Sequence, residues 1–141
     1  MTYHQLMLEN HQLLARKLLE RVAAEGLSSG QPKVLEFLLE HDGCMQKEIA
    51  QACSVEAASV TSLLNKMERD GLVERRIPRD NRRVSQVWLT EAGREKAQIV
   101  GDTFAELEEI VFTGFTPDEK QTMLVMLQQI QRNLKEDGSR E

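Results

Sequence analysis

The sequence has no long apolar run and no apolar leader. No stretch approaches the length of about eighteen residues that is needed to cross a membrane. The first residues, MTYHQLMLENHQ, lack the apolar region of a signal peptide. We therefore expect a cytoplasmic protein without a membrane partner. With 141 residues, of which 40% are hydrophobic, the chain is one domain-sized unit that can form a core.

Groups typical of catalysis or metal binding are also scarce. The three histidines, His4, His11 and His41, are scattered, and Cys44 and Cys53 lie nine residues apart without a companion pair. The sequence contains no nucleophile elbow, no glycine loop that would cradle a phosphate and no paired catalytic constellation. We therefore expect no enzyme activity, no metal site and no cofactor.

The two cysteines fit a reducing compartment. Each lies in an apolar setting, which favours the role of a small buried hydrophobic side chain. A thiol switch at Cys44 or Cys53 is the alternative.

What the sequence does contain, at residues 59–90, is an amphipathic helix followed at once by an arginine-rich hairpin. Val60, Leu63, Leu64 and Met67 recur at the spacing of one buried helix face. The opposite face and its flanks carry short hydrogen-bonding side chains and, behind them, cations: Ala58, Ser59, Thr61, Ser62, Asn65, Lys66 and Arg69. This layout suits contacts to base edges near the front of the helix and to phosphates behind.

The hairpin begins after Asp70-Gly71, because glycine tolerates the left-handed conformation that ends a helix. We expect strands at Leu72–Ile77 and Val84–Leu89, separated by a turn at Pro78–Asn81. Their period-two pattern predicts one inward face, made by Val73, Ile77, Val87 and Leu89.

Positive charge is concentrated on this hairpin. Between Arg75 and Arg83 there are five arginines and one acid, Asp80, so the segment carries +4 while the whole chain carries −5. A cationic tip on an acidic protein indicates a place where a polyanion docks. The alternative is a solvated charged hairpin.

A shorter helical segment, Met45–Cys53, precedes the amphipathic helix. Its Ile49, Ala50 and Cys53 can face inward, and Ser54–Glu56 is long enough only for a tight turn. The order helix, turn, helix predicts that the second helix enters the major groove of DNA. Gln46 and Lys47 would then face the DNA backbone.

In this order and spacing, the motifs resemble the MarR-type winged-helix regulators. The similarity covers residues 27–93 and rests on Leu27–Leu35, His41–Ala50, Val60–Leu64, Gly71–Arg75, and Arg82-Arg83 leading to Leu89–Gly93. Members commonly have Asp directly before the arginine pair. Here Asn81 holds that place, and Asp80, one residue earlier, could still reach Arg82.

The two ends of the chain predict how the module assembles. Residues 3–25 form a helical stretch with Leu6, Leu14, Leu18 and Val22 on one side, and a long helix runs from Glu91 to about Val111. Thr116–Glu119 starts a last helix, in which Met123, Leu127, Ile130 and Leu134 form a narrow apolar seam. We expect Leu6, Leu14 and this seam to form a two-fold dimer. The alternative is a helix folded back on its own core.

The predicted fold is mainly α with a small β wing: a winged helix-turn-helix with a helical dimerisation region from both chain ends. Its predicted parts are 1–26, an N-terminal dimerisation helix, 27–93, the DNA-binding core, and 94–141, the C-terminal dimerisation helices. Residues 91–141 hold eleven acids and six bases, so this half should point away from DNA.

The predicted function is a homodimeric transcriptional regulator, a repressor, that binds a palindromic double-stranded DNA operator. The candidate DNA contacts are Gln46, Lys47, Ser59, Thr61, Ser62, Asn65, Lys66, Arg69, Arg75, Arg82 and Arg83. The resemblance singles out Arg82 and Arg83 in the wing, and it implies a pocket for a small aromatic effector whose residues the sequence does not identify. Two alternatives remain: a winged-helix adaptor that binds an acidic protein, and a cysteine-based redox-sensing regulator. Redox-sensing relatives usually carry their reactive cysteine in the first helix, where this chain has none.

Overall fold

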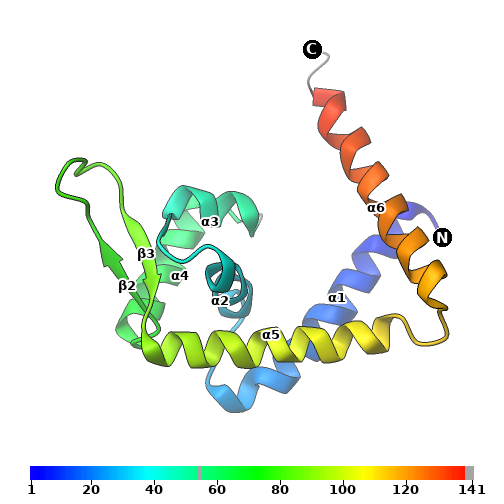
Figure 1. Cartoon of the computed structure of the whole chain (residues 1–141), viewed down its shortest axis with the longest axis horizontal. Coiled ribbons are helices and arrows are strands. Elements are labelled where there is room, and N and C mark those ends of the chain that lie inside the picture. Colours follow the sequence, from blue (N-terminus) through cyan, green and yellow to red (C-terminus); the bar gives the residue numbers. More distant parts are fainter. Residues whose placement is uncertain (54, 139–141) are drawn as a thin grey trace. The chain divides into compact units, whose positions relative to one another are not determined.

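A computed structural model describes residues 1–53 and 55–138 of the chain, which form helices and one small antiparallel sheet (Figure 1). The elements in chain order are α1 (Tyr3–Val22), the short 3-10 helix η1 (Ala23–Glu25), α2 (Gln31–Glu40), β1 (Cys44–Met45), α3 (Gln46–Ala52), α4 (Ala57–Arg69), β2 (Val73–Arg76), β3 (Gln86–Leu89), α5 (Glu91–Val111) and α6 (Pro117–Asp137). The predicted fold class, mainly α with a small β wing, is confirmed. No helix in the described part of the chain is long and apolar enough to cross a membrane.

The described chain divides into two units, Met1–Leu107 and the part from Glu108 onward. The first unit contains the sheet, all helices up to α4 and most of α5. The second contains α6, which begins at the cap predicted from the sequence: Thr116 Oγ1 accepts from the Glu119 N–H at 3.1 Å. The functional division into 1–26, 27–93 and 94–141 stays a prediction.

The core of the first unit is built from the faces that the helical spacing predicts. Val60, Leu64 and Met67 of α4 are fully buried, and Leu63 is half-buried. They pack in one cluster with Leu35 of α2 and further apolar side chains: Leu18, Val22, Leu27, Val34, Leu38, Ile49, Val73, Val87, Leu89, Ala97, Val100 and Leu107. This cluster fixes α4 with one face inward and the opposite face in solvent.

The sheet has the strand order β1-β3-β2, and both pairings are antiparallel. Val73 pairs with Leu89 and Arg75 with Val87. The sequence did not reveal β1, whose Cys44 pairs with Val87 on the other side of β3. A strand of two residues is too short to leave a period-two pattern.

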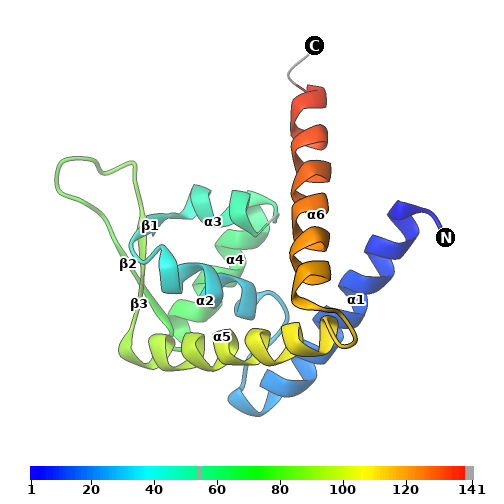
Figure 2. The ribbon, with the colours of Figure 1, turned by 45° about the vertical axis from the view of Figure 1, so that its right-hand side comes forward.

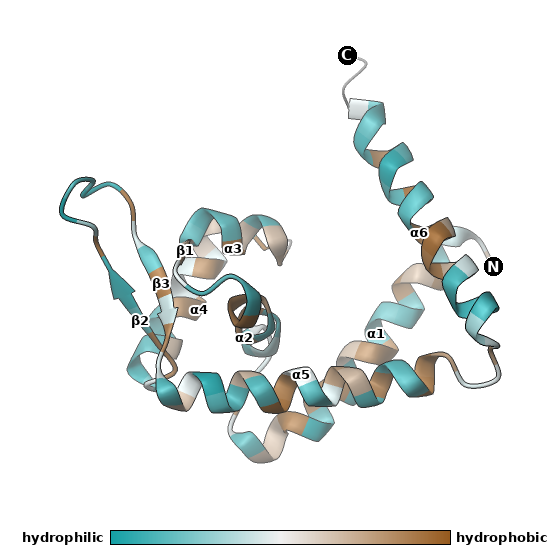
Figure 3. Ribbon diagram, viewed as in Figure 1, coloured by the Kyte–Doolittle hydropathy of each residue, from teal (hydrophilic) through white to brown (hydrophobic). Residues whose placement is uncertain are grey.

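The predicted inward position of Ile77 is wrong. Pairing ends at Arg76 and Gln86, and Pro78 has no N–H to continue the ladder. Beyond this point the hairpin projects away from the helices, as Figures 1 and 2 both show, and it offers no core to either face. Ile77 is therefore 62% exposed, and the tip of the hairpin is hydrophilic (Figure 3).

The end of α4 is set by glycine, as the sequence predicts. Gly71 has a φ of 76°, in the left-handed region, and its N–H donates to the Glu68 carbonyl at 3.1 Å. Three residues, 70–72, therefore suffice to connect α4 to β2. The preceding turn, predicted at Ser54–Glu56, is described only at Val55 and Glu56, because Ser54 lies outside the described residues.

Candidate nucleic-acid interface

The exposed face of α4 carries the predicted base-reading residues. Ser59, Ser62, Asn65 and Arg69 are all exposed, and their side chains make no hydrogen bond or ion pair within the described residues. Ser62, Asn65 and Arg69 line one shallow groove together with Glu68. The free donors and acceptors of this face are available to an external partner.

Thr61, in contrast, is already engaged. Its Oγ1 accepts a hydrogen bond from Gln46 Nε2 of α3 at 2.6 Å and donates to the Ala57 carbonyl at 3.0 Å. Gln46 thus joins the two helices of the helix-turn-helix and has its amide donor directed into the protein. Lys47, the next residue of α3, is exposed.

Lys66 also has a partner. Its Nζ donates to Ser28 Oγ at 3.2 Å, which joins α4 to the loop before α2. Gly30 of the same loop has a φ of 89°, and a Cβ placed there would lie 3.2 Å from Leu63 Cδ2. The loop between α1 and α2 is therefore in close contact with the reading helix.

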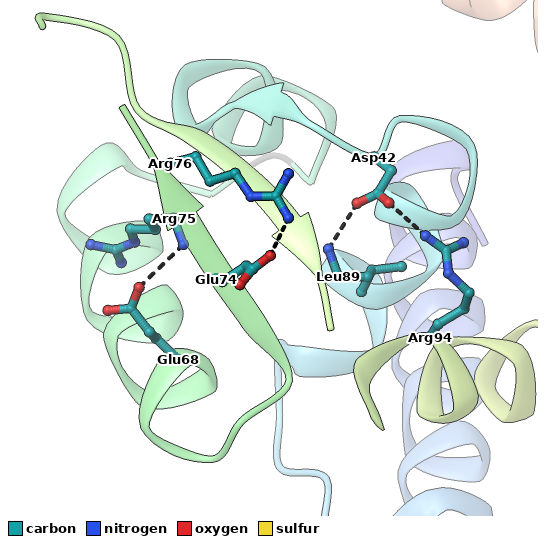
Figure 4. Close-up of polar contacts among 7 residues, drawn as sticks. All are labelled: Asp42, Glu68, Glu74, Arg75, Arg76, Leu89 and Arg94. Atoms are coloured by element: carbon teal, nitrogen blue, oxygen red, sulfur yellow. Dashed lines mark hydrogen bonds and ion pairs between the residues drawn. The ribbon is translucent and has the colours of Figure 1, made fainter. Parts of the chain in front are cut away.

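The two arginines of strand β2 lie on opposite faces and have different surroundings (Figure 4). Arg75 faces α4, where its Nη2 donates to the Thr61 carbonyl at 3.4 Å and its Nε is buried without a partner. Arg76 forms an ion pair with Glu74, and its guanidinium lies 4.8 Å from the centre of the Trp88 ring. Both guanidinium groups are held by the protein.

The other three arginines of the hairpin lie in the loop between β2 and β3. Arg79, Arg82 and Arg83 are exposed, and no side-chain hydrogen bond or ion pair holds them within residues 1–53 and 55–138. With Asp80 between them, these arginines give the loop a net charge of +2, and no acid in the described part of the chain forms an ion pair with them. The loop is therefore the hairpin's free cationic surface.

Asn81 organises this loop through the backbone. Its Oδ1 accepts from the Arg83 N–H at 3.1 Å, and its own N–H donates to the Pro78 carbonyl at 3.3 Å. Asp80 forms no ion pair with Arg82 in the structure. An amide at position 81 thus stabilises the turn, which the sequence predicted at Pro78–Asn81, without neutralising an arginine.

The base of the hairpin is anchored by Asp42, at the end of α2 (Figure 4). Its Oδ1 accepts from the Leu89 N–H at 2.8 Å, and its Oδ2 accepts from Arg94 Nη2 at 2.5 Å. One carboxylate therefore joins α2, β3 and α5. The wing is held at its base while its loop projects into solvent.

Thr90 and Gly93 belong to the Leu89–Gly93 motif, and their contacts give a physical reason for it. Thr90 Oγ1 donates to the Gly71 carbonyl at 2.6 Å and accepts from the Gly93 N–H at 2.9 Å. A Cβ placed at Gly93 would lie 1.8 Å from the Leu72 carbonyl oxygen, so no larger residue fits. The motif therefore packs the first turn of α5 directly against the start of the hairpin.

The two cysteines are weakly acidic. Burial, followed by the charge of Glu48, raises the pKa of the Cys44 thiol to about 11. Burial also raises the pKa of Cys53. Both side chains therefore stay as thiols near neutral pH, which disfavours the redox-sensing alternative because the thiolate is the reactive form.

Two cavities lie among the helices of the first unit. One, of about 520 Å³, is lined by His11, Lys33, Glu36, Phe37, Glu40, His41, Ala52, Cys53 and Phe104. The other, of about 410 Å³, is lined by His11, Ala15, Arg16, Leu18, Leu19, Ser29, Gly30, Pro32 and Lys33. The second combines an apolar wall with cations and has no acid in its lining.

Comparison with known proteins agrees with this geometry. A sequence model of the MarR family matches residues 25–83. The HTH-type transcriptional regulator YwoH of Bacillus subtilis (strain 168) is 31% identical over 113 residues, covering 80% of this chain and 82% of the relative. The HTH-type transcriptional repressor YetL of the same organism is 30% identical over 108 residues, covering 74% of this chain and 64% of the relative.

The fold is also found in a solved complex with DNA. A MarR-family regulator from Listeria monocytogenes, solved with a 26mer DNA, superposes with a TM-score of 0.91. The match covers 97% of this chain and 91% of that one at 16% identity, so it establishes the fold alone. Fold, family model and identity to YwoH agree: the chain belongs to the MarR family of transcriptional regulators.

Proposed function

We propose that this regulator is a repressor that binds a palindromic double-stranded operator as a homodimer. One observation carries the proposal: a helix face of unpaired polar side chains and a loop of unpaired arginines lie in the same unit of the fold. A helix and a hairpin with a purely structural role would not need unpaired side chains on both surfaces. A surface that binds DNA needs unpaired donors and acceptors on the helix and unpaired cations on the loop.

In this proposal α4 enters the major groove. Ser59, Ser62 and Asn65 reach base edges, and Arg69 reaches a phosphate. The hairpin loop lies along the adjacent minor groove, where Arg82 and Arg83 meet the deepened negative potential of narrow A·T-rich steps.

The adaptor alternative predicts that the same loop binds an acidic protein. Two measurements distinguish the DNA-binding regulator from the adaptor. Duplexes are first enriched from a random library on the purified protein, and the affinity for the enriched duplex is then measured at a series of salt concentrations. We expect a defined consensus and a steep fall in affinity with salt, because neutralised phosphates release counterions. Failure to enrich any sequence, with only weak binding to duplex DNA, would favour the adaptor.

Dimerisation is supported by apolar surface at both ends of the chain. Leu6, Leu8 and Leu13 of α1 are 44%, 50% and 45% exposed, and Met126 and Leu134 of α6 are 60% and 67% exposed. Side chains of this size exposed along a helix are typical of a surface that another chain covers. An operator with two-fold symmetry then matches two copies of the reading helix.

The test of the dimer replaces Leu127 and Ile130, both half-buried, with Asp. Two unpaired carboxylates in an interface cost several kcal/mol, so we expect the dimer to dissociate or unfold. The control places Asp at the exposed Gln128 and Gln131 of the same helix, which should leave the dimer intact. Analytical ultracentrifugation distinguishes the outcomes. A variant that stays dimeric would support the alternative of a helix folded back on its own core.

We expect repression because a protein that occupies an operator within a promoter blocks the binding of RNA polymerase. The relative named as a repressor, YetL, supports this sign of regulation. Transcription in vitro from a promoter that carries the enriched duplex tests it. We expect fewer transcripts as protein is added, and an increase would show an activator.

We further propose that a small aromatic carboxylate is the effector and occupies the cavity of about 410 Å³. Leu18, Leu19 and Pro32 supply apolar contacts, and Arg16 and Lys33 supply positive charge. The cavity also touches Ser29 and Gly30, next to the Ser28 hydroxyl that holds Lys66 of α4. A ligand bound in this cavity would contact the loop between α1 and α2, which in turn contacts the reading helix.

Benzoate is a suitable probe for this cavity. We expect calorimetry to detect binding, and we expect added benzoate to weaken binding to the enriched duplex. Arg16→Gln should abolish both effects, whereas Arg21→Gln should not, because Arg21 pairs with Glu106 and does not line the cavity. Release of DNA by benzoate that persists in Arg16→Gln would place the effector elsewhere.

A further inference from the structure

The candidate DNA contacts divide into side chains that are free and side chains that the fold already uses. Among the latter, Gln46, Thr61 and Arg75 come from three different elements, α3, α4 and β2, and meet at one residue. Thr61 accepts from Gln46 through its hydroxyl and from Arg75 through its carbonyl. Thr61 is therefore the point at which the reading helix is joined both to its partner helix and to the wing.

Two donor hydrogens at this point are already used within the protein. The Thr61 hydroxyl hydrogen is given to the Ala57 carbonyl at 3.0 Å, and a Gln46 amide hydrogen is given to Thr61 at 2.6 Å. A hydroxyl has one donor, so Thr61 has none left for a base edge or a phosphate. It can offer DNA only an acceptor lone pair, which excludes a contact to a phosphate oxygen and leaves only base amino groups as partners.

Arg75 is held at two points along α4. Its side chain reaches the Thr61 carbonyl at 3.4 Å, and its backbone N–H donates to Glu68 Oε2 at 3.3 Å. Thr61 and Glu68 are seven residues apart, which places them two turns apart on one face of the helix. The buried Nε shows that the guanidinium is sunk against the protein. Strand β2 is thereby fixed along α4.

We infer that Gln46, Thr61 and Arg75 are positioning residues, which fix the angle of the reading helix against α3 and the wing and act on DNA without touching it. This inference rests on the proposed DNA-binding function. It assigns base and phosphate contacts to the free residues only, such as Asn65 and Arg82. Hydrogen bonds to base edges need accurate placement, so a loosened helix binds less tightly to every sequence.

The first test uses a duplex enriched on the wild-type protein and a double-mutant cycle. Thr61→Val removes the hydroxyl, and with it the bonds to Gln46 and Ala57, at nearly constant shape, and it should weaken binding by about three- to tenfold. Thr61→Ser keeps the hydroxyl and should bind like the wild type. Gln46→Ala should also weaken binding. The double variant Gln46→Ala/Thr61→Val should be no weaker than Thr61→Val alone, because the Gln46–Thr61 bond is already lost in that variant.

The second test separates positioning from phosphate contact at the arginines. Arg75→Gln should lower affinity but leave its dependence on salt unchanged, because no phosphate contact is lost. Arg82→Gln, which removes the same charge from the free loop, should reduce the salt slope by about one unit for each copy bound. Circular dichroism and thermal unfolding establish that each variant is folded.

The outcomes are distinct. If the losses at Gln46 and Thr61 multiply in the double variant, or if Arg75→Gln reduces the salt slope as Arg82→Gln does, these residues contact DNA and the inference is overturned. If the wild type enriches no duplex at all, the proposed function fails, and the inference fails with it. A shared loss at Gln46 and Thr61 with an unchanged slope at Arg75 supports the positioning role.

Discussion

Replacing Arg82 and Arg83 with Ala should weaken DNA binding without unfolding the protein. Both side chains are exposed and have no partner within the described residues, so their loss breaks no internal contact. We expect the free energy of unfolding to change by less than about 0.5 kcal/mol. The whole effect of the double variant should therefore appear in its interaction with DNA.

The size of the effect follows from the number of charges removed. Each neutralised phosphate contributes about 0.9 to the slope of log affinity against log salt concentration. Two arginines in each of two proposed copies give four contacts, so the slope should become shallower by about 3 to 4. When salt rises from about 50 to about 200 mM, the advantage of the wild type over the variant should shrink by about a hundredfold.

Fluorescence anisotropy with the enriched duplex at a series of salt concentrations measures both slopes. The control is Arg76→Ala, which removes one formal charge from the same hairpin, half of the charge that the double variant removes. Since Arg76 is paired with Glu74 and stacked on Trp88, we expect its slope to stay near that of the wild type. An Arg82/Arg83 variant with the wild-type slope, or an Arg76 variant whose slope falls by as much per arginine removed, would show that the loop arginines are not the phosphate contacts.

Three further predictions concern single residues. Asn65→Ala should cost about 1–3 kcal/mol of binding and relax the preference at one or two base positions; an unchanged enriched consensus would exclude Asn65 from base reading. Gly93→Ala should destabilise the fold by several kcal/mol in chemical denaturation, because its Cβ would lie 1.8 Å from the Leu72 carbonyl oxygen. Gly101→Ala in the same helix has room, with its nearest neighbour at 3.5 Å, and should be neutral or stabilising by up to about 1 kcal/mol.

A last prediction concerns pH. Partial desolvation, followed by the negative charge of Glu40, raises the pKa of Glu36, so its ionised form disfavours the folded state once the pH exceeds the ordinary value of 4.5. Glu36→Gln should therefore raise the melting temperature at neutral pH, and the gain should vanish as the pH falls below 4.5. A gain of the same size at both pH values would contradict the assigned cause.

Features set by neighbouring residues were predictable from the sequence. The spacing of Val60, Leu64 and Met67 gave the buried face of α4, and Gly71 gave its end, because helical periodicity and the left-handed conformation depend on local sequence. The same holds for Thr116, whose capping bond involves a residue three positions later. These features fixed the fold class and the order of its elements.

Features set by distant partners were not predictable in the same way. Gln46 and Thr61 are fifteen residues apart and Lys66 and Ser28 are thirty-eight apart, so no local pattern indicates that their donors are engaged. A polar side chain on an exposed helix face looks the same in the sequence whether or not the fold has already used it. Sequence reasoning therefore predicted which face of α4 is exposed, but it could not sort that face into free and engaged residues.

The wing shows the same distinction in its charge. The five arginines between Arg75 and Arg83 look equivalent in the sequence and sum, with Asp80, to +4. In the fold, the last paired residue of β2, Arg76, divides them. Before that point Arg75 faces α4 and Arg76 is neutralised by Glu74. After it the arginines are free, and the loop carries only +2. The position at which strand pairing stops, and not the number of arginines, therefore sets the charge that DNA would meet.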